Sequence, residues 1–426
     1  MADNGGAARN GSAGRATVSL TGRHLLVLGE DLAGDDDAAC AAVQELAEAE
    51  EVTNTRDAER GAASRAHPTY FAELGVAVAD LSAQQLEAAR VDPRLLGVEP
   101  ERVQRAIGGP LSEEYLHGFH DAAQFLHSRI AGVAAGAVPT RFGDTDKLTW
   151  GLQATGVADT PETGAGTTIA VLDTGLDLGH PDFAGRDIEA RSFVDGQTAQ
   201  DVHGHGTHVT GTACGALAPG TGRRYGIAHE ARILVGKVLG DDGSGTDADI
   251  LAGMSWAISS GAQVISMSLG SDIEQVSTAF EIVGRRALAA GTLVVAAAGN
   301  NARRSAGNTG FVGMPANSPS IMAVAAVDSA LAIADFSAAS STIQGGQVDI
   351  AGPGVDVYSS WPVPQGTNTI SGTSMATPHV AGIAALWSAR TGATGQQLWA
   401  QLVQVAQRLP LSSSDVGSGL VRAPGV

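Results

Sequence analysis

The middle of the chain alternates apolar segments with helical ones, and this pattern constrains the fold more than any other feature. Helices are predicted at 249–260 and 278–290. Near-continuous apolar runs predict strands before, between and after them, at Ile169–Leu172, Ile233–Val238, Val264–Ser268, Leu293–Ala298 and Ile321–Val327. Strands that are apolar on both faces and separated by helices are typical of a parallel sheet covered on both sides. The sequence therefore predicts an α/β domain over residues 150–426.

A serine lies at the start of an apolar helix near the C-terminus. Ser374 falls among small residues in Gly372–Gly382, and no charge follows until Arg390. Pro378 is expected in the first turn, where a missing N–H is tolerated. Free N–H groups and the positive end of a helix dipole suit a nucleophile that must stabilise an oxyanion. A serine at a helix start is also a common N-cap, so this motif alone leaves both interpretations open.

A carboxylate and a histidine can complete a catalytic site. Asp173 ends the apolar strand in Ile169–Gly175, and His205 lies at a second predicted helix start in Asp201–Thr212. Aspartate, histidine and serine can act as orienting carboxylate, base and nucleophile. In this chain order, the three motifs resemble those of subtilisin-like serine endopeptidases almost residue for residue. The resemblance extends from about Trp150 to the C-terminus and implies the three-layer, mainly parallel subtilisin-like fold.

The resemblance also implies a role for each catalytic side chain. The family motif has its catalytic histidine directly before Gly-Thr-His-Val, which favours His205 over His203 and His208. Asn300 would donate to the oxyanion, although Gly-Asn is also an ordinary turn sequence. The implied catalytic residues are Ser374 as nucleophile, His205 as general base and then acid, Asp173 as orienting carboxylate and Asn300 as oxyanion donor.

Two backbone segments resemble the edges with which an extended substrate pairs as added strands. They are Gly243, Ser244, Gly245 and Ser268, Leu269, Gly270. The residues that resemble the walls and floor of the family's primary specificity pocket are Ala298, Gly299 and Gly313, and all three are small and uncharged. A large apolar P1 residue is therefore expected, although loop glycines are common for other reasons. Asp247 stands near the position where many relatives carry an aromatic residue at the S4 subsite, so no strong aromatic P4 preference is expected.

Metal sites are less clearly indicated. The resemblance implies no cofactor for catalysis, but His180-Pro181-Asp182 matches a motif whose aspartate binds calcium in many relatives, which makes Asp182 a candidate ligand for structural calcium. No companion loop is recognisable in 217–227. Asp241, Asp242, Asp247 and Asp249 can form a further cluster or a solvated acidic loop. His117 and His120 have metal-compatible spacing, but solvated side chains explain them more simply.

The N-terminal part predicts a separate small domain. Residues 23–106 show the order β-α-β-β-α-β, which is typical of a ferredoxin-like α+β unit. The segments 86–88 and 97–100 resemble the inhibitor propeptides of subtilisin-type proteases. The resemblance implies an intramolecular inhibitor that also assists folding. An unrelated small α+β domain is the alternative.

Two further segments flank this unit. Residues 1–22 are rich in Gly, Ala, Asn and Ser and are expected to form a disordered tail. Residues 107–149 predict a linker with an amphipathic helix around 116–130. Maturation cleavage is expected between about Arg105 and Lys147, in the small and polar residues of this linker.

Charge and cysteine content argue against certain kinds of binding partner and against a disulfide-stabilised fold. The net charge is −19, and only Lys147 and Lys237 are lysines, which argues against nucleic acid and anionic membranes. Cys40 and Cys214 fall in different predicted domains, so no disulfide framework is expected. No apolar run resembles a signal peptide or a membrane span, so the sequence shows either an intracellular protein or one whose export route is not visible.

The sequence thus predicts a serine endopeptidase for protein or peptide substrates, made as a self-inhibited precursor. A peptide-processing or transpeptidating relative with the same triad is an alternative. A non-catalytic binding module on the same fold is a second alternative, against which the complete triad and Asn300 argue.

Overall fold

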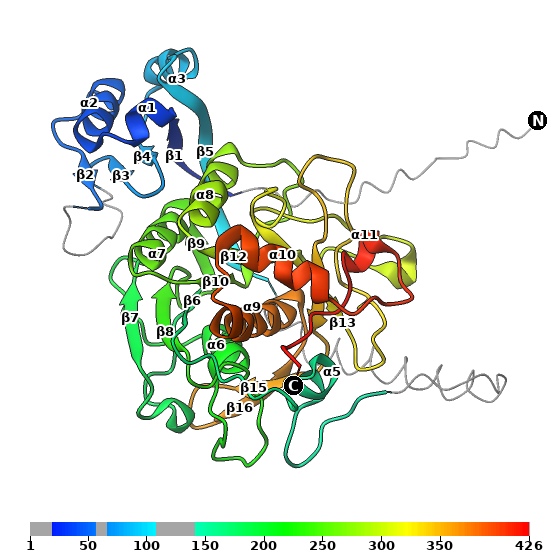
Figure 1. Ribbon diagram of the computed structural model, residues 1–426. Helices are drawn as coiled ribbons and strands as arrows, with labels where there is room; N and C mark the ends of the chain where they lie inside the picture. Colours follow the sequence, from blue (N-terminus) through cyan, green and yellow to red (C-terminus); the bar gives the residue numbers. More distant parts are fainter. Residues whose placement is uncertain (1–18, 57–65, 108–140, 426) are drawn as a thin grey trace, which may run out of the picture.

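The computed structural model describes residues 19–56, 66–107 and 141–425, which form two large sheets and one two-stranded sheet (Figure 1). The larger sheet has seven strands, and every neighbouring pair in it is parallel. Its order is β14 (Ile350–Pro353), β13 (Met322–Val327), β12 (Leu293–Ala297), β10 (Val264–Met267), β6 (Thr168–Asp173), β8 (Arg232–Lys237) and β7 (Ile188–Ser192). The parallel sheet predicted from the apolar strands is confirmed.

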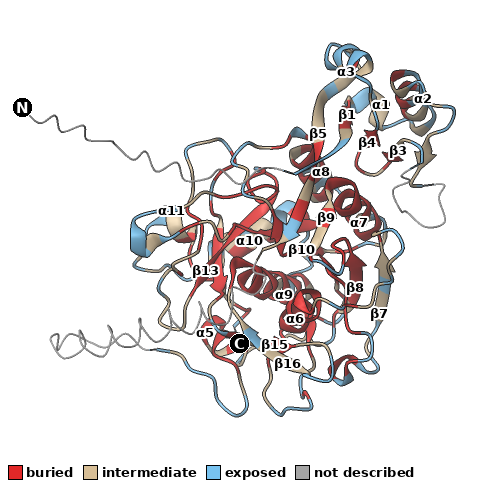
Figure 2. Ribbon diagram, turned by 180° about the vertical axis from the view of Figure 1, so that it is seen from behind, coloured by how far each residue is buried: buried red, intermediate tan, exposed pale blue. Residues whose placement is uncertain are grey.

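Helices cover both faces of this sheet. Along the inner strand β6, Ile169 and Val171 pack with α6 (His205–Cys214) and α9 (Thr373–Thr391), whereas Ala170 and Leu172 pack on the other face. That face is covered by α7 (Asp247–Ser259) and α8 (Thr278–Ala289). α10 (Gly395–Val405) adds Leu398 and Leu402 to the core of α9. Figure 2 shows the resulting buried centre, and the predicted three-layer arrangement is confirmed.

Some elements of the catalytic region were not predicted from the sequence. The edge strand β7 is half-buried and contains Glu189 and Arg191, so it lacks the apolar run of the central strands. β14 is only four residues long and includes Gly352 and Pro353. The hairpin of β15 (Val357–Ser360) and β16 (Thr367–Ile370) and the short helix α5 (Trp150–Thr155) were also not predicted.

The N-terminal sheet is a mixed α+β unit with one strand and one short helix more than the predicted β-α-β-β-α-β order, because β3 and α1 were not predicted. The strands lie in the order β5 (Leu95–Ala106), β1 (Leu20–Leu28), β4 (Val76–Ala79), β3 (Thr69–Phe71) and β2 (Thr53–Asn54). Its helices are α1 (Glu30–Ala33), α2 (Asp36–Ala47) and α3 (Ala83–Arg90). Ser82 forms the expected N-cap, within a capping box with Gln85.

Three boundaries in this region differ from the predictions. β1 begins at Leu20, inside the segment predicted as a tail, because it pairs with the far end of β5 at Arg102. β3 lies partly within the predicted polar loop at 57–69. β5 continues to Ala106, well past the five-residue strand expected at 95–99. The helix predicted around 116–130, with His117 and His120, lies outside the described residues.

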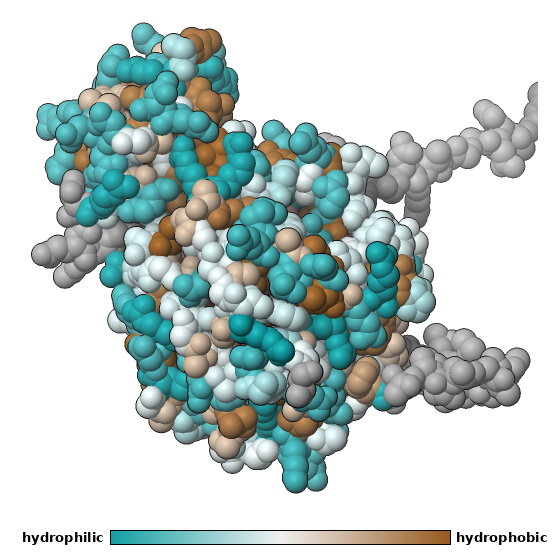
Figure 3. All heavy atoms as spheres, viewed as in Figure 1, coloured by the Kyte–Doolittle hydropathy of each residue, from teal (hydrophilic) through white to brown (hydrophobic). Residues whose placement is uncertain are grey.

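The two sheets are joined through one face and one edge. Leu26 and Leu28 pack beneath α2, whereas Leu25 and Val27 point the other way and share a core with α7 and α8. The end of β5 pairs antiparallel with β9 (Ser244–Thr246) and β11 (Leu269–Gly270) of the catalytic region. Figure 3 shows the N-terminal region as a lobe seated on the larger one.

The stretch 141–149, predicted as part of the linker, lies against the catalytic region. Phe142 donates its N–H to the Ser329 carbonyl and packs against the core. Leu148 forms a β-bridge with Arg224. Among the residues described, no helix has the length and apolar character needed to cross a membrane.

Candidate active site

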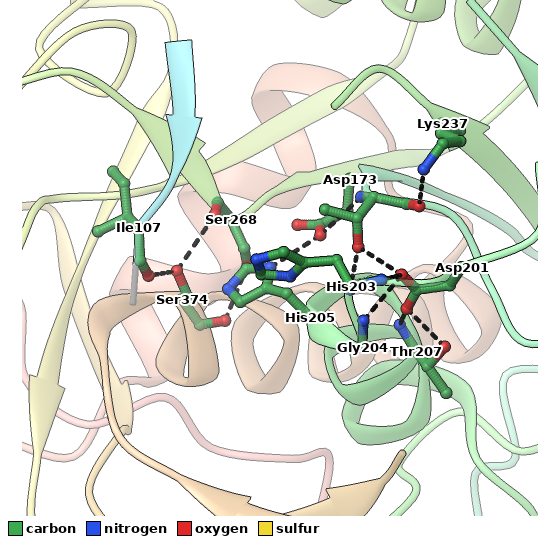
Figure 4. A network of polar contacts seen from close by, with 12 residues as sticks. Ile107, Asp173, Asp201, His203, Gly204, His205, Thr207, Lys237, Ser268 and Ser374 are labelled. Carbon is green, nitrogen blue, oxygen red and sulfur yellow. Dashed lines mark hydrogen bonds and ion pairs between the residues drawn. The ribbon is translucent and has the colours of Figure 1, made fainter. Parts of the chain in front are cut away.

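The structure brings the three predicted motifs together at the carboxyl end of the parallel sheet (Figure 4). Asp173 is the last residue of β6, and His205 and Ser374 lie in the first turns of α6 and α9. The carboxyl ends of neighbouring parallel strands and the helices that follow them are where α/β folds place ligands. Residues 173, 205 and 374 therefore converge because of topology, despite their distance in the sequence.

Asp173 holds one nitrogen of the His205 ring. Its Oδ1 lies 2.7 Å from the ring Nδ1 and also accepts the N–H of Thr174 at 2.8 Å. Both side chains are buried, with 1% of each exposed. Burial opposes a charged imidazole, but the negative charge and hydrogen bond of Asp173 outweigh it and raise the pKa of His205 above its ordinary value. The ring is thus fixed in orientation and favoured as a proton acceptor at Nε2.

Asp201 is a polar residue of this site that the sequence reasoning missed. Its Oδ1 accepts the N–H groups of His203 and Gly204 at 3.0 and 2.9 Å. Its Oδ2 accepts from the N–H and hydroxyl of Thr207 at 2.8 and 2.7 Å. A carboxylate shortly before a helix is the usual signal for such a cap. Asp201 fixes the start of α6 and thereby the position of His205.

Pro378 explains a contact beside the serine. It lies in the second turn of α9, not in the first turn as predicted, so the Ser374 carbonyl receives no N–H from four residues ahead. The hydroxyl of Ser268 donates to that carbonyl instead, at 2.8 Å. The helix start is thus held against the strand end. The Ser374 hydroxyl lies 3.1 Å from the Ser268 carbonyl oxygen, at the end of the cleft between the backbone edges Gly243–Gly245 and Ser268–Gly270.

A segment of the chain itself occupies that cleft. The Ser374 hydroxyl contacts the carbonyl oxygen of Ile107, directly after β5. The N–H of Ile107 donates to the Ser268 carbonyl at 3.1 Å, and the N–H of Ala106 donates to the Gly243 carbonyl at 2.9 Å. The predicted edges thus lie on either side of an extended segment, with Arg105 opposite both Ser244 and Gly270.

Asn300 lies beside this carbonyl. Its Oδ1 accepts from the N–H and hydroxyl of Thr373 at 3.0 and 2.9 Å, which directs the amide nitrogen away from Thr373. A Cβ on Gly372 would stand 3.1 Å from the Asn300 Nδ2 and 3.4 Å from the Ile107 oxygen. The small residue at 372 therefore keeps this space open. The N–H of Ser374, in the first turn of α9, has no carbonyl partner four residues back within the helix.

Comparisons with known proteins agree with this geometry. The model of the subtilase family, Peptidase_S8, matches residues 164–419, more than half of the chain. Subtilisin of Bacillus pumilus is 41% identical over 267 residues, covering 62% of this chain and 90% of the relative. The subtilisin-like serine protease Pen ch 13 of Penicillium rubens is 32% identical over 322 residues, covering 74% of this chain and 69% of the relative. The chain belongs to the subtilase family.

This subtilase is a subtilisin-like serine endopeptidase, so its substrates are proteins or peptides. Subtilisin E of Bacillus subtilis is 40% identical over 267 residues, covering 62% of this chain and 65% of the relative. The regions of about 40% identity are too short to include all of both the catalytic and the N-terminal sheets.

The predicted specificity pocket of the subtilase is made of neighbouring backbone. Gly313 donates its N–H to the Ala298 carbonyl at 2.9 Å, and Ala298 continues into Gly299 at the end of β12. A Cβ on Gly270 would stand only 2.8 Å from the Ile107 Cδ1, so the absence of a side chain at Gly270 leaves room for the side chain of Ile107. The roles of Ala298, Gly299 and Gly313 as pocket walls stay predictions.

The other histidines of the motif have different surroundings. His208 is buried, binds the Val357 carbonyl through Nε2 at 2.9 Å, and has its pKa lowered by burial to about 3. It is therefore a neutral structural residue. Burial also lowers the pKa of His203, whose ring lies 6.2 Å from that of His205 and beside Gly243.

The carboxylate of Asp182 is bound by protein groups. Its Oδ2 accepts the Tyr225 hydroxyl at 2.5 Å, and its Oδ1 accepts the Gly220 N–H at 2.8 Å. No group of three histidine, cysteine or acidic side chains able to hold a metal ion occurs within residues 19–56, 66–107 and 141–425. The calcium prediction for Asp182 gains no further ligand from the structure and stays a prediction.

Two other predictions can be compared with the structure. Neither Cys40 nor Cys214 forms a disulfide among the described residues, and burial raises the pKa of Cys214 to about 12. The idea of a solvated acidic loop is wrong for Asp247 and Asp249, because they are 0% and 5% exposed. Both lie in the first turn of α7, which the sequence reasoning started too late.

Proposed function

We propose that the segment from β1 to Ile107 is an inhibitory propeptide and that the enzyme cleaves its own chain after Ile107. The observation that carries the proposal is the contact of the Ser374 hydroxyl with the Ile107 carbonyl oxygen. The residues before Ile107 pair with both cleft edges, so that carbonyl is presented as the scissile one of a bound substrate. Ile107 is then P1, and the bond that breaks joins it to Gly108.

The proposed chemistry needs only groups of this chain and water. The Ser374 oxygen bonds to the Ile107 carbonyl carbon while its proton passes to the His205 Nε2, and Asp173 stabilises the imidazolium. The N–H of Ser374 and the amide of Asn300 bind the oxyanion. The C–N bond to Gly108 then breaks, and the imidazolium gives its proton to the leaving amine. Water, activated by the same ring, releases the acyl group.

Further contacts support a docked inhibitor. Glu99 accepts the N–H of Thr278 at the start of α8, and Glu101 accepts the N–H of Ala248 at the start of α7 at 3.1 Å. Carboxylates are favourable at helix N-termini, where N–H groups lack partners. Glu101 is also held by Arg23 of β1 at 2.8 Å, which ties this contact to the rest of the N-terminal sheet. The inhibitor thus contacts the N-termini of both α7 and α8 as well as the cleft.

Intact-mass analysis of the purified precursor tests the proposal. The wild-type chain should yield a new N-terminus at Gly108, and Ser374→Ala should stay uncut with an unchanged far-UV circular dichroism spectrum. A fluorophosphonate probe should label the matured wild type at Ser374. Cleavage of the Ser374→Ala precursor at the wild-type rate, in a protease-free preparation, would contradict self-processing.

A further inference from the structure

Asp247 lies at the far end of the occupied cleft and contacts the side chain three residues before Ile107. Its Oδ1 accepts from the Gln104 Nε2 at 2.6 Å, and its Oδ2 accepts the N–H of Arg102 at 2.8 Å. Both Asp247 and Gln104 are 0% exposed. With Ile107 as P1, Gln104 is P4, so Asp247 is the carboxylate at the base of the S4 subsite.

This carboxylate is held rigidly by its helix. Asp247 is the first residue of α7, and the preceding Thr246 forms a capping box with Asp249. The Thr246 hydroxyl lies 2.8 Å from the Asp249 Oδ2 and 3.2 Å from its N–H. Gly245 pairs with Gln104 directly across the cleft edge. Because backbone on both sides is fixed, the Asp247 oxygens cannot easily turn away from an unsuitable P4 side chain.

In its contact with Asp247, the Gln104 side chain uses its N–H donor and leaves its oxygen acceptor without a partner in the described part of the chain. Among the described residues, the Gln104 Oε1 is buried without a hydrogen-bond partner, whereas its Nε2 is bound. Burial and the charge of Glu101 oppose ionisation of Asp247, whereas the hydrogen bonds from Gln104 and Arg102 and the charge of Arg102 favour it. A side chain with only N–H donors would satisfy the subsite at least as well as glutamine. An apolar side chain would leave a buried carboxylate oxygen unpaired, which is unfavourable.

We propose that Asp247 makes this enzyme select substrates whose P4 side chain donates N–H groups, namely glutamine, lysine or arginine, over substrates with an apolar P4 residue. The proposal rests on the proposed function, because cleavage after Ile107 defines Gln104 as P4. A subsite that hydrogen-bonds its substrate discriminates by the cost of leaving its own polar groups unpaired. Loss of a hydrogen bond to a charged group of this kind should lower kcat/KM by about 10- to 100-fold.

Matched quenched-fluorescence peptides test the proposal on the matured enzyme. Each peptide contains Xaa-Arg-Ala-Ile-Gly, the chain's own sequence around Ile107, with glutamine, lysine, leucine or glutamate as Xaa. Wild type should cleave the glutamine and lysine peptides about 10- to 100-fold better than the leucine peptide, and the glutamate peptide worst. Asp247→Leu should reverse the order of glutamine and leucine.

Two more variants separate charge from shape. Asp247→Asn keeps an oxygen acceptor, so it should retain the glutamine peptide while losing the advantage of lysine. Asp242→Asn removes an exposed charge from the same loop and should leave the P4 profile unchanged. Equal kcat/KM for glutamine and leucine in wild type, with cleavage after isoleucine, would overturn the P4 proposal and leave the proposed function intact. Cleavage at another bond, or none in any peptide, would overturn both.

Discussion

The two sheets of this protein are completed in different ways. The parallel catalytic sheet has helices of its own region on both faces. Its inner strand β6 directs Ile169 and Val171 to one face and Ala170 and Leu172 to the other. The N-terminal sheet has its own helices on one face only, and its other face is covered by α7 and α8 of the catalytic region. The catalytic region is thus complete by itself, whereas the N-terminal region is built to dock.

Asp173→Asn tests whether the catalytic chemistry is confined to the self-contained region. The change keeps the shape of the side chain but removes the charge that stabilises the imidazolium. Turnover should fall by about 10⁴, the effect of the analogous change in another protease fold. Steady-state kinetics on a P4-glutamine peptide measures it, and thermal unfolding of the variant should match that of wild type. A loss below tenfold would show that another carboxylate orients His205.

The docking of the N-terminal region should depend on pH through Asp247. Burial beneath β5 raises the pKa of Asp247 to about 7, against hydrogen bonds from Gln104 and Arg102 and the charge of Arg102, which lower it, while Glu101 raises it. The docked state therefore prefers the protonated carboxyl. Affinity should be highest below the ordinary pKa near 4 and should fall as pH rises through about 7, by up to about 10³-fold.

Fluorescence titration of the Ser374→Ala catalytic domain with the N-terminal fragment measures this dependence without interference from proteolysis. Asp247→Asn cannot ionise at this position, so its affinity should vary much less between pH 4 and 8. An equally steep dependence in Asp247→Asn would assign the effect to other groups at the interface.

Leu25 and Leu26 compare the two faces of the docking sheet directly. Both are 0% exposed and neighbours in β1, but Leu25 faces α7 and α8 whereas Leu26 faces α2. Leu25→Ala should weaken inhibition by the fragment about 10²-fold, since truncating a buried leucine typically costs 2–5 kcal/mol. It should leave the circular dichroism spectrum of the free fragment unchanged.

Leu26→Ala is the matched control and should reduce the helical signal of the free fragment. Equal effects of both variants on inhibition and on the free spectrum would show that the two faces are equivalent. That result would remove the contrast between a self-contained sheet and a docking one.

His203→Ala should have the smallest effect, below tenfold in kcat/KM. His203 has no hydrogen bond to Asp173 in the described residues, and its ring lies at the cleft edge beside Gly243. His205→Ala should instead remove nearly all activity, because it deletes the base. Equal losses in both variants, measured on one peptide, would show that the base is assigned to the wrong histidine.

The features that could be predicted from the sequence are those that depend on residues adjacent in the chain. Apolar runs predicted the five inner strands of the parallel sheet but not β7 and β14, and the three motifs predicted a site of Asp173, His205 and Ser374, because each motif is continuous in the chain. The pairing of Gln104 with Asp247 was not predicted, since it joins positions 143 residues apart. The full length of β5 was missed for the same reason, because its second half pairs with distant segments, namely the start of β1 and the strands β9 and β11.

Local exceptions were missed as well. Pro378 lies inside α9, where Ser268 supplies the donor that the helix lacks, and nothing local announces that partner. Asp201 carried a local signal, as an acidic residue just before a helix, but its network spans Thr174 and Thr207 across two elements. Such contacts follow from how elements pack, which periodicity does not specify.

Inhibition in trans tests most directly whether the N-terminal region is a docked inhibitor. A fragment of residues 19–107, with its fold checked by circular dichroism, is added to the matured catalytic domain, and peptide hydrolysis is followed against fragment concentration. Tight inhibition is expected, and it should be lost when the fragment ends at Val103, because the residues facing S4 to S1 are then missing. No inhibition by the folded, full-length fragment at micromolar concentration would contradict the account.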